Sequence, residues 1–134
     1  MKVLVMTAIY PSPERPAFGT FVRSQVESLR RAGVDVEVMV LSGRNRKLMY
    51  PKAVFQLRRR LSRGDIDLVH AHYSYVGMVA RTQWKVPVVV TYHGDDLLGT
   101  RTPEGKITTF SKIMVRAGQI LAKTVNAVIV QSKQ

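Results

Sequence analysis

The stretch "RAGVDVEVMVL", residues 31–41, contains the pattern that decides the fold. Valine occupies positions 34, 36, 38 and 40, and this strict alternation is typical of a β-strand. Gly33 comes immediately before it, where the end of a helix favours a residue with left-handed backbone angles. The stretch therefore predicts a helix that ends and a strand that begins within a few residues.

The residues before this stretch predict a strand and the helix that precedes Gly33. Residues 2–7 are a candidate strand. Residues 3–6 within it are apolar without a break, as expected of a strand covered on both faces. A loop with three prolines follows, and Thr20 is a candidate cap for a helix that runs to about Ala32. Three apolar residues fall on one face of this helix: Val22, Val26 and Leu29.

The residues after the stretch repeat the alternation of helix and strand. Pro51 suits the first turn of a second helix, which Gly64 ends. The apolar side expected for this helix consists of Val54, Phe55, Leu57 and Leu61. Further strands are expected at 67–72, 87–93 and 127–132, and further helices at 75–83 and 110–121.

This order of elements predicts an α/β domain. Strands that alternate with helices build a parallel sheet with helices on both faces, which is a doubly wound, Rossmann-like architecture of about five strands. In such sheets ligands bind beyond the carboxyl ends of the strands, where the strand order switches direction. The loops after the first, third and fourth strands are therefore the places to look for a site.

Composition limits the class of protein. The 134 residues suffice for one domain, and the absence of cysteine excludes disulfides and thiolate metal sites while permitting a reducing cytoplasm. No apolar run approaches the roughly 20 residues that a membrane span needs. The formal net charge of +12 favours anionic partners such as nucleic acid, acidic lipid or phosphorylated substrates.

The positive charge is concentrated between Ser42 and Gly64, a segment without any acidic residue. Charge runs of this kind are either a solvated helix face or a surface that meets an anion, and the sequence leaves both open. The candidate anionic-surface patch consists of Arg44, Arg46, Lys47, Lys52, Arg58, Arg59, Arg60 and Arg63.

Gly19 is the candidate phosphate-binding residue. It lies directly before a predicted helix, whose free N–H groups and dipole favour an anion. Ordinary turn chemistry also explains a glycine at this position, and from this residue alone it is the favoured interpretation. The Gly-x-Gly-x-x-Gly fingerprint of dinucleotide binding is absent, which disfavours a nicotinamide or flavin enzyme.

Histidines and aspartates follow the third and fourth strands. His70 and His72 are two residues apart and share one face of an extended chain, and His93 follows the next strand. A three-histidine metal site is conceivable, but no carboxylate has matching ligand spacing, so we expect no metal. Asp95 and Asp96 are adjacent and are expected to point in opposite directions, and one of them is a candidate turn cap.

Four motifs in this order resemble the amino-terminal half of a GT-B fold glycosyltransferase, and the most similar family is glycosyltransferase family four. They are the glycine before the first helix, "RAGVDVEVMV", "DLVHAH" and "VTYHGDD", and the resemblance covers nearly the whole chain. The family often has two adjacent glycines in the first loop, where this chain has Phe18–Gly19.

The resemblance implies specific roles. Gly19 would approach the donor phosphate through its backbone, and His93 would contact the sugar as the catalytic residue. The sugar and acceptor cleft would also include Tyr10, His72, Gly94, Asp95 and Asp96. No cofactor or metal is implied, because the donor is a nucleotide diphosphate sugar.

The resemblance further implies that residues 1–134 form the acceptor-side domain and that a carboxyl-terminal donor-binding domain lies outside this chain. The expected reaction is transfer of a hexose to an acceptor hydroxyl with retention, and we expect no turnover by this chain alone. Expected partners are a carbohydrate or lipid-linked acceptor, the missing carboxyl-terminal half or a partner subunit, and a second copy of the chain. The expected location is the cytoplasm, at the inner face of an anionic membrane.

The alternative is a non-catalytic basic module that binds nucleic acid or an anionic membrane. Nucleic acid is not favoured, because aromatic residues make up only 7% and do not alternate with the basic ones.

Overall fold

A computed structural model describes residues 1–42, 46–92, 116, 121 and 123–130, without the side chains of residues 46 and 47. The strands of this part are β1 (Lys2–Thr7), β2 (Asp35–Val40), β3 (Leu68–His72), β4 (Val88–Tyr92) and β5 (Ala127–Val130). Its helices are α1 (Thr20–Arg31), α2 (Arg46–Leu61) and α3 (Ser74–Ala80). All five predicted strands are confirmed. The predicted helix at 110–121 lies almost wholly outside the described residues.

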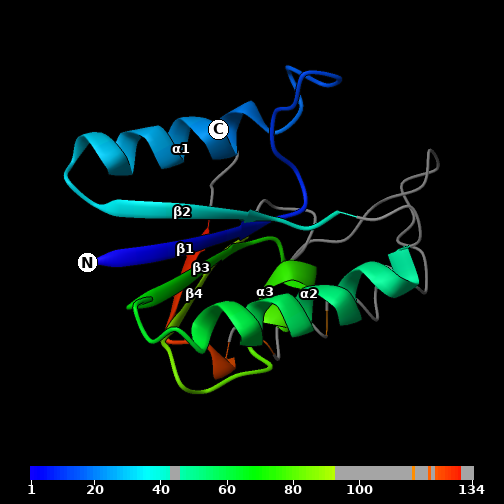
Figure 1. Cartoon of the computed structure of the whole chain (residues 1–134), viewed down its shortest axis with the longest axis vertical. Coiled ribbons are helices and arrows are strands. Elements are labelled where there is room, and N and C mark those ends of the chain that lie inside the picture. Colours follow the sequence, from blue (N-terminus) through cyan, green and yellow to red (C-terminus); the bar gives the residue numbers. More distant parts are fainter. Residues whose placement is uncertain (43–45, 93–115, 117–120, 122, 131–134) are drawn as a thin grey trace.

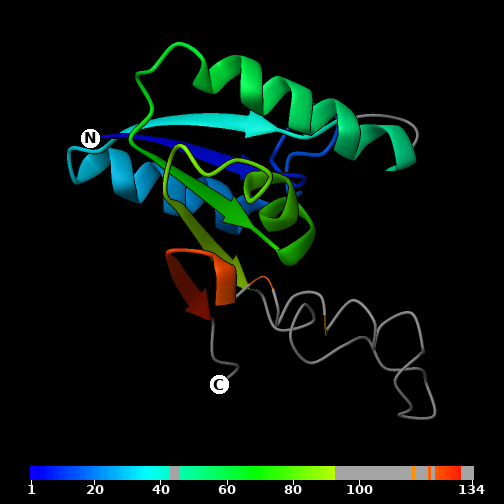
Figure 2. The same cartoon turned by 90° about the horizontal axis from the view of Figure 1, so that it is seen from below.

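The five strands form one parallel sheet in the order β2-β1-β3-β4-β5. Figure 2 shows this order, with β2 at one edge of the sheet and β5 at the other. The order switches direction at β1, because the chain goes from β1 to β2 on one side and returns to β3 on the other. The pair of β1 and β3 is therefore the switch point of a doubly wound, Rossmann-like sheet, as predicted.

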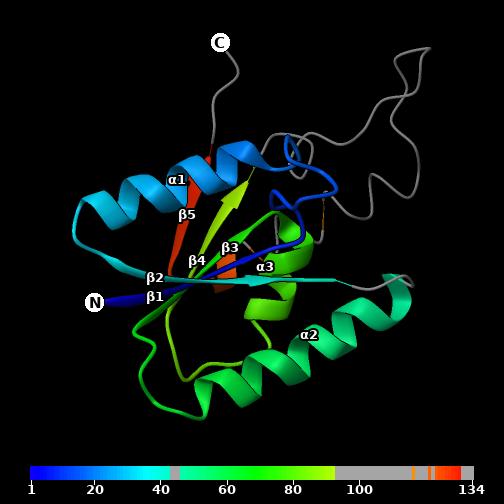
Figure 3. The same ribbon diagram turned by 45° about the horizontal axis from the view of Figure 1, so that its top comes forward.

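Helices cover both faces of the sheet. α1 lies on one face, and α2 and α3 lie on the other (Figures 1 and 3). Side chains of β1 alternate between the two layers as a pleated strand requires. Val3 and Val5 pack with α1, whereas Leu4 and Met6 pack toward α2 and α3.

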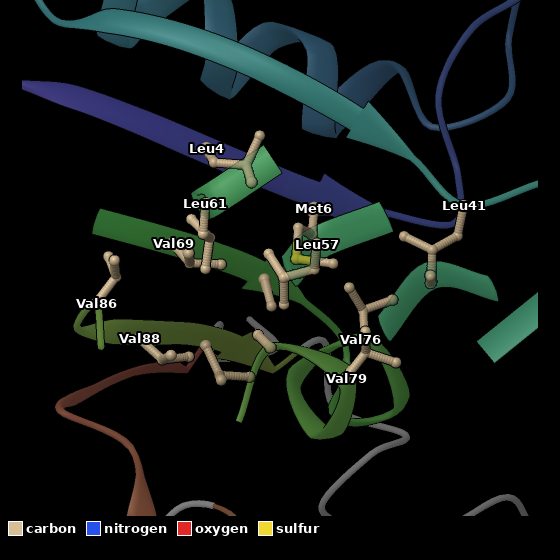
Figure 4. Close-up of a cluster of buried hydrophobic side chains, with 14 of the residues drawn as sticks. Leu4, Met6, Leu41, Leu57, Leu61, Val69, Val76, Val79, Val86 and Val88 are labelled. Carbon is tan, nitrogen blue, oxygen red and sulfur yellow. The ribbon is translucent and has the colours of Figure 1, made fainter. Parts of the chain in front are cut away.

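The larger core lies between the sheet and the layer of α2 and α3 (Figure 4). Leu57 and Leu61 of α2 meet Leu4 and Val69 of the sheet there, and each of these side chains is at most 5% exposed. Burying one such aliphatic side chain stabilises the fold by about 2 kcal/mol. This core fixes the sheet and thereby the positions of its carboxyl ends.

The start of α2 differs from the prediction. The helix begins at Arg46, and Pro51 lies inside it although the sequence predicted Pro51 in the first turn. Met49 and Tyr50 pack against the larger core, and the Tyr50 ring stacks on that of Tyr75 with centroids 6.0 Å apart. Packing therefore extends the helix past a proline that removes one of its backbone hydrogen bonds.

Two further local predictions were wrong. Thr20 is the first residue of α1, and Gly19 occupies the cap position without any side-chain cap hydrogen bond. Phe55 does not join the apolar side of α2: its side chain is 72% exposed, and Ala53 is buried beside Leu57 instead. The 3.6-residue period cannot separate the two faces of a helix that carries apolar residues on both.

Candidate functional site at the carboxyl edge of the sheet

The carboxyl ends of β1, β3 and β4 lie side by side. Met6 of β1 is in register with Ala71 of β3, and His72 of β3 is in register with Thr91 of β4. The loop from β1 to α1, the strand end at His72 and the residues after Tyr92 therefore start from one edge of the sheet. The fold brings together the strand ends from which the three loops that the sequence singled out begin.

Gly19 closes the loop from β1 to α1. Its φ of 74° is left-handed, and the N–H groups of Val22 and Arg23 donate to its carbonyl at the start of α1. A Cβ at this position would lie 2.6 Å from the carbonyl oxygen of Ile9 and 2.9 Å from the backbone nitrogen of Tyr10. Because this approach is between backbone atoms, the loop itself requires glycine here.

The start of α1 has the electrostatic character of an anion site. Its first turn contains no acidic residue, and no side chain caps it. The helix dipole therefore faces the carboxyl edge of the sheet without a carboxylate in its own first turn to offset it. The Thr7 hydroxyl holds the start of the loop, because it donates to the Ile9 carbonyl at 2.9 Å and accepts from the Ile9 N–H at 3.1 Å. The structure thus brings Tyr10 and Gly19, both predicted site residues, into one loop junction.

The two histidines of β3 do share one face, as their spacing predicted. Their rings stack with centroids 4.7 Å apart, and His70 Nε2 lies 2.6 Å from the Thr91 hydroxyl oxygen in a hydrogen bond. His70 is 6% exposed and His72 is 1% exposed. The pair therefore belongs to the buried end of β3. The side chain of His72 is not accessible from solvent as a residue lining an open cleft would be. Among the described residues no group of three or more His, Asp or Glu could hold a metal ion.

Several predicted site residues cannot be placed. His93, Gly94, Asp95 and Asp96 lie outside the described residues, as does Arg44. The same holds for the side chains of Arg46 and Lys47. What is described is β4, whose last residue, Tyr92, is fully buried and directly precedes His93 in the sequence.

Arg60 does not belong to the predicted anionic-surface patch. Its side chain is 9% exposed and forms paired hydrogen bonds with the carboxylates of Glu37 and Asp65. These bonds hold the pKa of both carboxyls below their usual values, with Lys2 adding a third hydrogen bond at Asp65. Arg60 therefore joins α2 to the sheet. The side chains of Lys52, Arg58, Arg59 and Arg63 are exposed.

Two surface features were missed by the sequence analysis. Phe55, Arg58 and Arg59 line an open hollow of about 480 Å³ on the outer side of α2. Trp84, in the loop between α3 and β4, is 73% exposed, and the Arg81 guanidinium lies 3.7 Å from its ring centroid. The hollow was indicated in the sequence only by the run of basic residues on α2. The exposure of Trp84 was not predictable, because a single tryptophan between polar residues forms no periodic pattern.

Comparison with known proteins decides the family. The sequence profile of Glycosyltransferase Family 4 matches residues 6–134. The chain belongs to glycosyltransferase family 4. This membership does not favour the alternative of a non-catalytic basic module.

One relative and two solved structures extend this picture. TuaC of Bacillus subtilis (strain 168) is 24% identical over 91% of this chain and 44% of its own length. It is provisionally named a teichuronic acid biosynthesis glycosyltransferase. Sucrose-phosphate synthase from Thermosynechococcus elongatus superposes with a TM-score of 0.69 and 18% identity over 98% of this chain and 43% of that one. The substrate binding protein CD0873 from Clostridium difficile gives 0.51 and 14% over 99% of this chain and 57% of that one.

These relatives are distant in sequence, and each is much longer than this chain. At such identities the two structures show the fold alone, and CD0873 illustrates that this sheet also occurs outside the family. The chain spans less than half the length of TuaC and of sucrose-phosphate synthase. In the described part of the chain no helix has the length and apolar character needed to cross a membrane.

Proposed function

We propose that this chain is the acceptor-side, amino-terminal domain of an enzyme that transfers a hexose from a nucleotide diphosphate sugar to an acceptor hydroxyl with retention of anomeric configuration. In this reaction the bond between the anomeric carbon and the diphosphate oxygen breaks, a bond to the acceptor oxygen forms, and the proton of the acceptor hydroxyl passes to the departing diphosphate. The observation that carries the proposal is the acid-free, uncapped start of α1 at the switch point of a family 4 sheet.

The start of α1 would act on the leaving group. Negative charge develops on the diphosphate as its bond to the sugar breaks, and fixed N–H dipoles stabilise that charge. The left-handed turn at Gly19 lets the backbone lie at the carboxyl edge without a side chain in the way. No cofactor and no metal is part of the proposal.

The remaining predicted residues would position sugar and acceptor. His93 would orient the sugar through a hydrogen bond as the catalytic residue, next to a loop formed by Gly94, Asp95 and Asp96. Tyr10 would border the acceptor side, since its backbone adjoins Gly19. Buried His72 would act indirectly, as part of the packed end of β3. Correct positioning of the reactants supplies a large share of the rate in such a mechanism.

The donor-binding half would come from a carboxyl-terminal domain or a partner subunit. We also propose a carbohydrate or lipid-linked acceptor and a cytoplasmic location at the inner face of a membrane. The relatives that are more than twice as long as the matched segment support a two-domain enzyme.

Turnover of nucleotide sugars tests the proposal. The purified 134-residue chain is expected to release no nucleotide diphosphate, whereas a protein that contains both halves is expected to do so. In that protein His93→Ala should lower kcat by on the order of 10²-fold, as expected when one transition-state hydrogen bond is lost. Unchanged turnover by a folded His93→Ala variant, or full activity of the 134-residue chain alone, would contradict the assignment.

A further inference from the structure

The outer side of α2 carries a stripe in which apolar and basic residues alternate. Leu48, Lys52, Phe55 and Arg59 recur at i, i+4, i+7 and i+11, so they lie on one face of the helix. Leu48 is 68% exposed and Phe55 is 72% exposed, whereas the opposite face is buried at Ala53 and Leu57. Figures 1 and 3 show that α2 is the outermost helix of its layer.

The loop between α3 and β4 adjoins the second half of α2. The Arg58 guanidinium donates to the Thr82 carbonyl at 3.4 Å, which places the loop between α3 and β4 beside the second half of α2. This loop exposes Trp84 and Lys85. We use "α2 face" for the surface formed by Leu48, Lys52, Phe55, Arg58 and Arg59.

The charge of the α2 face has one sign. No acidic residue occurs between Ser42 and Gly64, and the hollow beside Phe55 is lined by the side chains of Arg58 and Arg59. Exposed aromatic and aliphatic side chains cost free energy in water unless something covers them. A partner that suits this surface must therefore offer negative charge and an apolar layer directly behind it.

We propose that the α2 face is a docking surface for an anionic lipid bilayer. Phosphate headgroups would meet Lys52, Arg58 and Arg59, while Phe55 and Leu48 enter the boundary between headgroups and acyl chains. Nucleic acid fits less well, because an aliphatic residue such as Leu48 offers no ring on which a base can stack. The proposal deepens the membrane location suggested above, but it does not depend on transferase activity.

Docking on this face would orient the rest of the domain. α2 follows β2 and runs back along the sheet, so its stripe extends from the carboxyl edge of the strands toward the opposite edge (Figure 3). A bilayer against the stripe would leave the strands lying along the membrane surface. The loop that contains Gly19 leads into α1 on the other face of the sheet, so it would then lie on the side of the sheet away from the bilayer.

Flotation of the 134-residue chain with vesicles tests the docking surface. We expect co-flotation with vesicles that contain phosphatidylglycerol and none with pure phosphatidylcholine vesicles. Lys52→Gln and Arg59→Gln should each weaken binding roughly fivefold, because each basic residue near an anionic surface adds about that factor. Phe55→Ser should also weaken binding, and Phe55→Leu should restore most of it because an apolar side chain returns.

Arg31→Gln is the matched control, since it removes one exposed positive charge from α1 on the other face of the sheet. It is expected to bind like the unmodified chain. Binding to both kinds of vesicle, binding to neither, or equal losses for Arg31→Gln and Arg59→Gln would overturn the proposal. So would oligonucleotide binding that competes with anionic vesicles and is unaffected by Phe55→Ser. None of these outcomes bears on nucleotide-sugar turnover with a soluble acceptor, so the two proposals fail separately.

Discussion

Gly19 and Gly64 have almost the same left-handed backbone angle, with φ of 74° and 75°, but their surroundings differ. A Cβ on Gly19 would meet the Ile9 carbonyl at 2.6 Å, whereas a Cβ on Gly64 would meet nothing within 4 Å. The two positions therefore separate the cost of a left-handed angle from the cost of a backbone clash.

Substitution by alanine should show this difference. Gly64→Ala is expected to lower the free energy of unfolding by about 1 kcal/mol, the usual cost of a left-handed angle for an L-residue. Gly19→Ala should cost roughly 3 kcal/mol, since the loop must also shift. Urea denaturation of both variants measures the difference. Equal decreases in the free energy of unfolding would show that the loop at Gly19 shifts to accommodate a Cβ without further cost.

Arg60 connects two acidic residues from different parts of the chain, Glu37 of β2 and Asp65 after α2. Its hydrogen bonds lower the pKa of both carboxyls in the folded state. A carboxyl with a lowered folded pKa adds stability above its unfolded pKa, near 4, and that stability is lost as the pH falls through the folded pKa. The stability that Arg60 adds through these two carboxyls is therefore expected to be lost progressively in acid.

Arg60→Met should reduce stability at pH 7 and flatten the dependence of stability on pH below about 4. The matched control is Arg23→Met, which removes an exposed i, i+4 pair with Glu27 and should cost no more than about 0.5 kcal/mol. Urea unfolding at a series of pH values decides the matter. Parallel pH curves for Arg60→Met and the unmodified chain would show that these ion pairs contribute little.

At the scale of elements, the close packing of α3 against the sheet depends on Gly77. A Cβ there would lie 2.8 Å from Leu121 Cδ2 and 3.0 Å from Val90 Cγ2. Val90 is fully buried and β-branched, so it has little room to turn away. The absence of a side chain at position 77 thus lets α3 approach β4 closely.

Gly77→Ala should destabilise the fold by about 1–2 kcal/mol through overpacking, although alanine favours the helix. Val90→Ala removes the two valine methyl groups, at 3.0 and 3.2 Å, and leaves Leu121 Cδ2 in place. The double variant should therefore lose less stability than the two single losses combined, and thermal or urea unfolding of all three measures the coupling. Additive losses would mean that α3 moves aside at no cost.

The elements also show what the sequence could predict. Strands were recognisable because β-branched runs between turn residues leave few alternatives, and their alternation with helices led to the parallel sheet. Phe55 and Pro51 were misjudged because tertiary packing of Met49 and Tyr50, which no local pattern encodes, sets the start and rotation of α2.

The candidate site was predictable only in part. The position of Gly19 followed from strand–loop–helix order, but the reason for a glycine did not, since it lies in the distance to the Ile9 carbonyl. Arg60 appeared to be one basic residue among many, because its acidic partners are far from it in sequence or on the next loop. Contacts of this kind depend on the assembled sheet.

At the scale of the whole molecule, the two edges of the sheet differ in protection. β2 carries Asp35 and Glu37, and charged side chains on an edge strand oppose pairing with another chain. β5 has no charged residue, and Val128, Ile129 and Val130 are 37%, 42% and 57% exposed. β5 is therefore the edge at which the chain is expected to associate with a second copy of itself.

Net charge opposes this association. Two chains with a formal charge of +12 repel each other at low ionic strength, and salt screens the repulsion over a Debye length of about 10 Å at 0.1 M. Sedimentation velocity should therefore show a dimer fraction that grows with protein concentration and with added salt. Ile129→Lys should abolish it, because a charge on the edge strand makes pairing unfavourable. Val40→Lys adds the same charge to β2 and is the control, since Val40 is also 42% exposed. If both variants reduced the dimer equally, net charge alone would govern association, and the exposed edge of β5 would have no part in it.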